Sequence, residues 1–274
     1  MRAARAVRWS LWLCLLGGLQ LAPSASADEW VTHIPGSLPL IITAPHGGNG
    51  SVFGCPERKP VGSRFVNRPD AATAQLAQQI ADALTVQTGK SPYLVIARFH
   101  RRYIDANRAP EEAFSDRHCA AAYEAYHRAI REAIERIRHA HTHALLIDVH
   151  GQSTYRSSIL RGTRHGHTVT GLLARGGPAA ITGPDSIFGR LAHMGYDVMP
   201  ANDLPPTGKV EPGGYTGGHT VALYGGSDAG RLDAIQLEFG IDLRQPGIIE
   251  QTAKDTAAAI ASFYRRYLIT GNSQ

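Results

Sequence analysis

Two histidines lie where chemistry is expected, each directly after a predicted strand and just before a glycine. His46 follows the apolar run Leu38–Ala44 and Pro45, and His150 follows Ala144–Val149. The glycines let backbone approach closely and leave the imidazoles uncrowded. Neutral imidazole is the commonest metal ligand in proteins. The pattern favours a metal site, with a surface or hydrogen-bonded role for either histidine as the alternative.

A hydrolytic zinc site needs a third protein ligand and an open position for water. The third residue after His46 is Asn49, so the familiar His-x-x-Glu spacing fails. The nearby acids are Glu57 and Asp70. Asp70 stands just ahead of a predicted helix, where it is also placed to cap that helix. The residues alone leave both roles open for Asp70, and Glu57 remains its rival as a ligand.

Two further carboxylates lie within predicted strands. Glu238 interrupts the apolar run Ile235–Phe239. Burying a carboxylate is costly unless it is paired or functional. A partly desolvated glutamate has a raised pKa, which suits a general base, and a structural ion pair is the alternative. Asp148 lies two residues before His150, and we expect it on the opposite side of the strand, either buried or supporting the site.

A strongly basic segment follows the second predicted strand. Between Arg98 and Arg108 the chain places four arginines, with an Asn107-Arg108 pair at the end. The guanidinium group presents a planar fork that matches a carboxylate. The segment therefore suggests recognition of an anionic substrate, and a solvated basic loop is the alternative.

A glycine-rich stretch, Gly213–His219, is expected to form a flexible loop. Its spacing matches neither a phosphate-binding loop nor a dinucleotide fingerprint, and we expect no helix after it. The chain also lacks a Gly-x-Ser-x-Gly elbow, which disfavours a serine hydrolase that would use Ser153.

The elements that must position these residues alternate between strand and helix. The predicted helices span 71–84, 115–138, 185–194 and 250–268. The predicted strands are Leu38–Ala44, Pro92–Phe99, Ala144–Val149 and Ala234–Phe239, with Ile159–Arg161 and Thr168–Ala174 as edge strands. This alternation predicts a single α/β domain, with a mostly parallel mixed sheet and helices on both faces. Ligands of such sheets bind beyond the carboxyl ends of the strands.

The first 27 residues have the three parts of a secretory signal. Arg2, Arg5 and Arg8 precede an apolar stretch from Trp9 to Leu21, and 25–27 reads Ala-Ser-Ala. The stretch is short for a bilayer span, and an uncleaved anchor is the alternative. We expect a signal peptide at 1–27, a catalytic domain at 28–274 and a secreted or periplasmic protein without a membrane span after cleavage.

Composition excludes several protein classes. With 43% hydrophobic and 19% charged residues, the chain is not disordered, collagenous or a coiled coil. The net charge of +5 falls to +2 without the three signal arginines. No basic stripe with interleaved aromatic residues is visible, so we expect no nucleic-acid partner.

Cleavage would leave Cys55 and Cys119 as the only cysteines. In an oxidising compartment two cysteines often pair, so a Cys55–Cys119 disulfide is possible. Two unpaired thiols are the alternative. The chain has no Cys-x-x-Cys motif, which argues against a cysteine zinc site.

Taken together, these segments resemble the N-formylglutamate amidohydrolases, within the wider zinc carboxypeptidase-like superfamily. The resemblance runs from about Pro39 to Arg244 and depends on an ordered set of short motifs. The motifs are Pro45-His46-Gly47-Gly48, Asp70 ahead of a helix, Arg98…Arg101…Asp105-Ala106-Asn107-Arg108, Tyr126-His127, Ile147-Asp148-Val149-His150, Gly213-Gly214-Tyr215 and Gln236-Leu237-Glu238.

The resemblance implies a role for each matched residue. It implies a zinc ion bound by His46, Asp70 and His150, with Glu238 as the general base that acts on zinc-activated water. It further implies that Arg101 polarises the scissile carbonyl. The residues assigned to substrate binding are Arg98, Asn107, Arg108 and Tyr215.

The implied activity is that of an exported zinc-dependent amidohydrolase or carboxypeptidase-like hydrolase. Its substrate would be an amide or peptide whose amine product carries a carboxylate, such as an N-acyl amino acid, an N-formylglutamate-like molecule or a peptide. The alternative is a catalytically inactive relative of the same fold that binds carboxylates or peptides.

Overall fold

The computed structural model describes residues 27–61, 65–226 and 232–269. The signal peptide expected at 1–27 lies outside the described residues, apart from Ala27. Within the described ranges, no helix is both long enough and apolar enough to cross a membrane.

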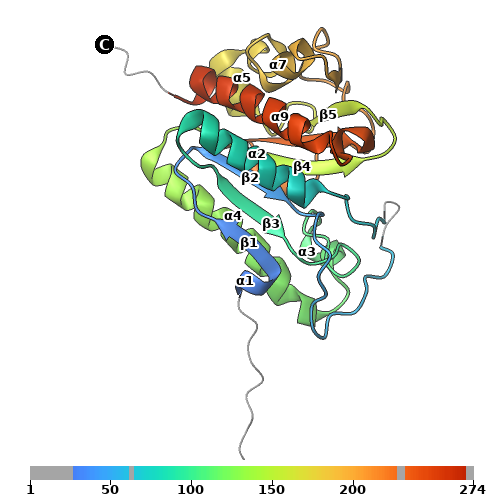
Figure 1. The fold of residues 1–274 in the computed structure, drawn as a ribbon. Helices are drawn as coiled ribbons and strands as arrows, with labels where there is room; N and C mark the ends of the chain where they lie inside the picture. The colour runs from blue at the N-terminus through green and yellow to red at the C-terminus, as the bar shows by residue number, and fades with distance from the viewer. Residues whose placement is uncertain (1–26, 62–64, 227–231, 270–274) are drawn as a thin grey trace, which may run out of the picture.

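Seven strands of the described chain form one mixed sheet, in the order β1-β3-β2-β4-β7-β5-β6 (Figure 1). The strands are β1 (Val31–Ile34), β2 (Leu40–Ala44), β3 (Tyr93–Ala97), β4 (Ala144–Gln152), β5 (Ser158–Gly162), β6 (Asp197–Met199) and β7 (Leu232–Gly240). The pairings β2·β3, β2·β4, β4·β7 and β5·β6 are parallel. The pairings β1·β3 and β5·β7 are antiparallel. The predicted fold class, an α/β domain with a mostly parallel mixed sheet, is confirmed.

Helices cover both faces of this sheet, which explains why its central strands are continuous apolar runs rather than alternating ones. The helices are α1 (Ala27–Trp30), α2 (Thr73–Thr88), α3 (Pro110–Ala113), α4 (Ala120–Ala140), α5 (Thr170–Gly176), α6 (Ala179–Thr182), α7 (Ile187–His193), α8 (His219–Tyr224) and α9 (Ile249–Phe263). Short 3-10 turns occur at η1 (Arg117–Cys119) and η3 (Ile241–Arg244), and a π turn, η4 (Tyr264–Leu268), ends α9.

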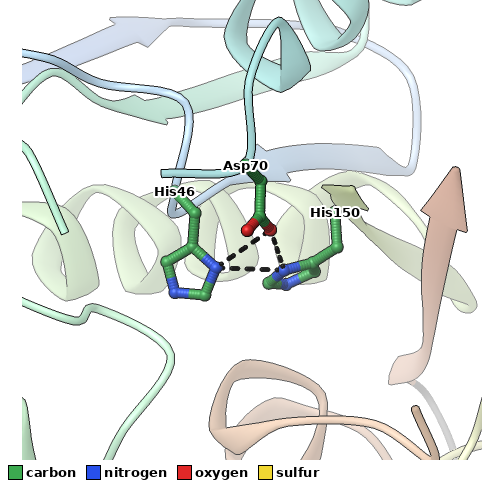
Figure 2. A group of neighbouring side chains, drawn as sticks. All are labelled: His46, Asp70 and His150. Atoms are coloured by element: carbon green, nitrogen blue, oxygen red, sulfur yellow. Dashed lines mark hydrogen bonds and ion pairs between the residues drawn. The ribbon is translucent and has the colours of Figure 1, made fainter. Parts of the chain in front are cut away.

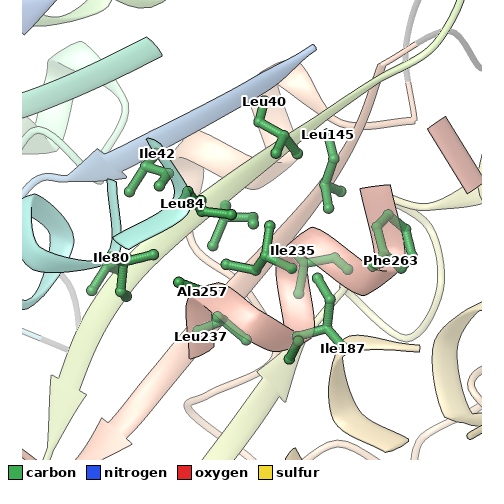
Figure 3. Close-up of a cluster of buried hydrophobic side chains, with 14 of the residues drawn as sticks. Leu40, Ile42, Ile80, Leu84, Leu145, Ile187, Ile235, Leu237, Ala257 and Phe263 are labelled. Atoms are coloured by element: carbon green, nitrogen blue, oxygen red, sulfur yellow. The ribbon is translucent and has the colours of Figure 1, made fainter. Parts of the chain in front are cut away.

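The apolar core is divided into two clusters by the sheet. On one face, α2, α9 and α7 pack on side chains such as Leu40, Leu145 and Ile235, as Figure 3 shows. On the other face, α4 and α8 pack on Ile41 and Leu146 among others. Figure 1 shows α2 and α9 side by side over the sheet. This packing makes the central strands a rigid base for the residues at their ends.

The strands change from apolar to polar on the α4 face as they reach their carboxyl ends. In β4, Leu146 lies in the core cluster of that face, and Asp148 and His150 follow at intervals of two residues. Side chains two residues apart in a strand share one face. In the register of the sheet, His150 lies beside Glu238 of β7. The sheet therefore brings these polar groups to one corner.

Several details of the secondary structure differ from the sequence prediction. Residues 168–174, predicted as an edge strand, lie largely in helix α5. The predicted edge strand Ile159–Arg161 belongs to β5, which lies inside the sheet between β7 and β6. Helix α8 begins at His219, the last residue of the glycine-rich stretch, where no helix was expected. Strands β1 and β6 were not predicted; both are at the sheet edges.

The disulfide between Cys55 and Cys119 is present, as the sequence prediction allowed, with 5.0 Å between the Cα atoms. It ties the segment after β2 to η1, directly ahead of α4. That segment has no regular helix or strand in its described part and leads to Asp70. The disulfide therefore closes a long irregular connection onto a helix that packs in the core.

We expect loss of this disulfide to destabilise the fold. The cross-linked cysteines are 64 residues apart, and closing a loop of that length is worth about 4 kcal/mol in the chain-entropy model. A Cys55→Ser/Cys119→Ser variant should therefore unfold roughly 10 °C below the parent. Thermal unfolding with and without reductant checks this, because reduced parent protein should match the variant. Equal unfolding temperatures in all samples would contradict it.

Candidate metal centre and active site

Three acceptor atoms from separate chain segments face one point at the carboxyl edge of the sheet. His46 Nδ1 lies 3.2 Å from His150 Nδ1 and 3.2 Å from Asp70 Oδ2, and His150 Nδ1 lies 3.1 Å from the same oxygen. Figure 2 shows the two rings and the carboxylate turned toward one another. Both histidines are buried. These residues form the one group of histidine, cysteine and acidic side chains in the described chain that could hold a metal ion.

A second carboxylate holds the far nitrogen of each ring. His46 Nε2 lies 2.7 Å from Asp105 Oδ1, and His150 Nε2 lies 2.9 Å from Asp148 Oδ2. An ionised carboxylate accepts the proton of the ring nitrogen that it contacts, so in the neutral, metal-binding form each ring would carry its proton on Nε2. In that form both Nδ1 atoms would be free to bind a metal ion beside Asp70. Metal-ligating histidines are typically oriented by a carboxylate in this way.

This triangle of atoms has the size that a small tetrahedral ion requires. Zinc–nitrogen bonds of about 2.05 Å give ligand–ligand distances of about 3.3 Å in a tetrahedron, close to the 3.1 and 3.2 Å found here. With both rings neutral, three lone pairs would face one point, and a cation bound between them would offset their mutual repulsion. Two imidazoles and a carboxylate are also a common donor set of catalytic zinc sites. The residues present therefore fit a zinc ion.

Asp70 reaches the histidines because the chain before α2 turns sharply. The Asp70 amide donates to the His46 carbonyl at 3.0 Å, and the Gly151 amide donates to Asp70 Oδ2 at 3.2 Å. The N-cap residue of α2 is Ala72, in a left-handed conformation and without a side-chain cap. Asp70 thus does not cap the helix with its side chain. Glu57 lies elsewhere, exposed and paired with Arg102 at 3.3 Å.

The electrostatics of this group are dominated by paired buried charges. Burial alone would raise the pKa of Asp105, but His46 and Arg101 outweigh it and hold that pKa well below its ordinary value. Burial likewise opposes ionisation of Asp70, whose pKa is nevertheless lowered by His46 and His150. Both carboxylates are therefore anionic at neutral pH and available to orient or bind a cation.

Glu238 lies beside the metal-binding group, and its pKa is shifted in the opposite direction from that of Asp70. Burial, opposed by His150, raises the pKa of Glu238 to about 7. Gln236, two residues earlier on the same face of β7, donates to Glu238 Oε1 at 2.9 Å and accepts from the Gly218 amide at 2.7 Å. A carboxyl group that titrates near neutrality suits a base that must take a proton and later return it.

A cavity of about 750 Å³ opens over these residues. That volume suits a small ligand. Four arginines and two acids line it: Arg68, Arg101, Arg108, Arg244, Asp70 and Glu238. Residues 213–218, in the glycine-rich stretch, form one wall. Glu211, just ahead of that stretch, is buried, and its carboxylate accepts from the amides of Thr163 and His165 at 2.8 and 2.9 Å. The lining favours an anionic ligand.

The Asn107-Arg108 pair lies at the edge of this cavity in a braced turn. Asn107 Oδ1 accepts from the Thr220 amide at 2.8 Å. Tyr123 donates to the Arg108 carbonyl at 2.9 Å. Burial lowers the pKa of His127 to about 4, so the neutral ring donates to the Ala106 carbonyl, 3.0 Å from its Nε2.

The structure brings most of the sequence-predicted site residues together. His46, Asp70 and His150 meet, and the cavity over them is lined also by Arg101, Asn107, Arg108, Tyr215 and Glu238. Arg98 differs, because its side chain is exposed and is not part of the cavity lining. Its backbone explains the position: the Arg98 amide donates to the Trp30 carbonyl and its carbonyl accepts from Gly50.

Several contributors were not predicted or were placed wrongly. Asp148 shares the face of His150 rather than the opposite one, because side chains two residues apart in a strand point the same way; the alternation was readable in the sequence. Asp105 and Arg244 received no role from the sequence. The spacing of Asp105 after Arg101 carries no periodic signal, since both lie in an irregular segment.

Comparison with solved structures supports the fold. The chain superimposes on an N-formylglutamate amidohydrolase from Ralstonia eutropha with a TM-score of 0.61 and 18% identity, over 86% of this chain and 98% of that one. A gene product from Agrobacterium tumefaciens gives a TM-score of 0.54 at 15% identity, over 87% and 94%. No protein-family model and no curated protein matches the sequence. The resemblance noted in the sequence is confirmed at the level of fold.

We expect Asp70, and not Glu57, to be required for metal binding. Asp70→Asn should weaken zinc binding by about 100-fold or more, since it removes a ligand rather than a supporting group. Glu57→Gln should keep the affinity of the parent, because Glu57 contacts Arg102 on the surface. Zinc titration of the metal-free proteins checks both. Full affinity in Asp70→Asn, or its loss in Glu57→Gln, would reverse the assignment.

Proposed function

We propose that this protein is a zinc-dependent amidohydrolase that cleaves an amide or peptide bond next to a carboxylate-bearing amine. The observation that carries the proposal is the triangle of His46 Nδ1, His150 Nδ1 and Asp70 Oδ2, each atom 3.1–3.2 Å from the others. Beside it lies a carboxyl group, Glu238, whose pKa is raised to about 7 by burial. A cation site next to such a base in a ligand-sized cavity is the arrangement of a metal-assisted hydrolase.

Zinc held by these three residues would lower the pKa of a water molecule and polarise a carbonyl group. The protein's own side chains carry out the remaining steps. Glu238 accepts the proton of the attacking water and then delivers it to the leaving amine. Arg101 donates to Asp105 and Asp70 at 2.8 and 3.4 Å, and its other N–H groups can stabilise the developing oxyanion.

The substrate class follows from the positive lining of the cavity. Arg108 lies at the edge of the cavity beside Asn107, and we assign this pair to the carboxylate of the amine product. Tyr215 lies on the glycine-rich wall and its hydroxyl contacts Thr154 at 2.9 Å; we assign it to substrate contact. N-acyl amino acids, N-formylglutamate-like molecules and peptide carboxyl ends all have the required chemistry.

We also propose that the protein is exported and works in the periplasm or outside the cell. Residues 1–27 have the composition of a signal peptide, and 28–274 would form the catalytic domain. The Cys55–Cys119 disulfide supports an oxidising location.

A carboxylate-binding protein without activity is the second candidate. The arginines of the cavity suffice for such binding, so they do not separate the two functions. Glu238 distinguishes the two functions, because a protein that only binds anions gains nothing from a buried carboxylate in the same cavity.

Glu238→Gln should abolish hydrolysis while the metal stays bound. Glutamine keeps the shape of the side chain but cannot accept the proton, so kcat should fall by about 100- to 10,000-fold. Zinc content and inhibitor binding should match the parent, which shows that the site is intact. The test is a screen of N-acyl amino acids and dipeptides on both proteins. A zinc-loaded parent inactive on the whole screen would favour the binding protein.

Arg108→Ala should raise KM for carboxylate-bearing substrates. Losing a charge-assisted hydrogen bond costs about 1.5–3 kcal/mol, which corresponds to a KM increase of about 10- to 100-fold. Substrates with a carboxamide in place of the carboxylate should be equally poor for parent and variant. Arg102→Ala is the matched control, because Arg102 lies in the same segment but pairs with Glu57 at 3.3 Å. A KM for the carboxylate that stays at the parent value in Arg108→Ala would refute the assignment.

A further inference from the structure

Arg244 is a buried cation whose hydrogen bonds all go to neutral backbone groups. Its side chain enters from η3, directly after β7, and the residue is 7% exposed. Among the described residues, no carboxylate lies within ion-pair distance of its guanidinium. Instead, Nε donates to the Phe239 carbonyl at 3.1 Å, Nη2 donates to the Gln152 carbonyl at 3.1 Å, and Nη1 donates to the Ala71 carbonyl.

These three carbonyls belong to three of the segments that build the site. Ala71 follows Asp70, Gln152 lies two residues after His150, and Phe239 follows Glu238. One planar group thus contacts the backbone beside two of the proposed metal ligands and beside the proposed base. No other described side chain has hydrogen bonds to all three segments.

The chain leaves space for this guanidinium at one particular residue. A Cβ atom at Gly151 would lie 2.4 Å from Arg244 Cζ and 2.6 Å from Nη1. Gly151 directly follows His150, and its amide donates to Asp70 Oδ2 at 3.2 Å. The absent side chain therefore lets Arg244 lie against the backbone of the site.

We propose that Arg244 is a positioning residue that fixes Asp70, His150 and Glu238 relative to one another through these three carbonyl groups. The geometry requires arginine, because its donors lie on three nitrogen atoms spread over a rigid plane. Lysine keeps the charge but has its donors on a single nitrogen, so it cannot bind three separated carbonyls. The consequence for hydrolysis follows only if the proposed function holds, whereas the positioning itself does not depend on it.

Hydrogen–deuterium exchange of the metal-free protein tests the positioning without any activity. In Arg244→Ala the backbone amides of 70–72, 150–153 and 239–241 should exchange at least about tenfold faster than in the parent, because their shared contact is lost. Free guanidinium at low millimolar concentration should partly reverse the change. Arg244→Lys should resemble Arg244→Ala, and it serves as the second variant if alanine prevents folding.

Arg175→Ala is the matched control. Arg175 donates to Asp233 at 3.0 Å at the opposite end of β7 from Glu238. Its loss should lower the unfolding temperature but leave exchange in the three segments at the parent rate. For zinc, Arg244→Ala should bind about 10- to 100-fold more weakly than the parent, and Arg175→Ala should bind as the parent does.

Two outcomes would overturn the proposal. The first is a folded Arg244→Ala with parent exchange rates in all three segments. The second is a uniform rise in exchange over the whole sheet that guanidinium does not reverse, which would mark Arg244 as a general stabiliser. A parent that binds no zinc would contradict the proposed function instead, and the exchange result would still decide the role of Arg244.

Discussion

The convergence of two imidazoles and a carboxylate on one point is the constraint on which this corner of the molecule depends. His46, His150 and Asp70 come from segments far apart in the chain, yet their acceptor atoms lie 3.1–3.2 Å from each other. The surrounding side chains hold them there rather than letting them separate. Asp105 and Asp148 keep the ring protons on the far nitrogens, and the packed sheet prevents the strands from moving apart.

The part of the site that could be predicted from sequence is the part carried by strands. His150 follows one apolar run and Glu238 lies near the end of another. Parallel strands bring their carboxyl ends to one edge, so the meeting of these residues follows from topology. The residues on irregular segments were harder. Arg98 was assigned to the substrate with its neighbours, but it lies where the backbone pairs with Gly50 and Trp30, and no periodicity indicates which side chain of such a segment turns inward.

Prediction of the secondary structure likewise succeeded for long regular elements and failed for some short ones. Long amphipathic helices such as α2 and α4 were predicted, with ends that differ from the observed ones by two to five residues, because a 3.6-residue pattern over many turns is hard to mistake. Residues 168–174 were assigned to a strand, since a short apolar run does not distinguish a buried strand from a helix. Asp70 could not be assigned from sequence, because a carboxylate ahead of a helix resembles a cap. Only the tertiary contacts with His46 and His150 show that its side chain is used elsewhere.

The contact between Gly151 and Arg244 has a consequence for how sequences of this fold can diverge. A side chain at position 151 would displace the guanidinium of Arg244 from its three carbonyls, because a Cβ would overlap it. A lineage that lost the arginine would release the glycine from selection, and the three carbonyls would then need a new donor. The two positions, 93 residues apart in the chain, should therefore covary, so that their joint state in an alignment would show which relatives keep this way of holding the strand ends together.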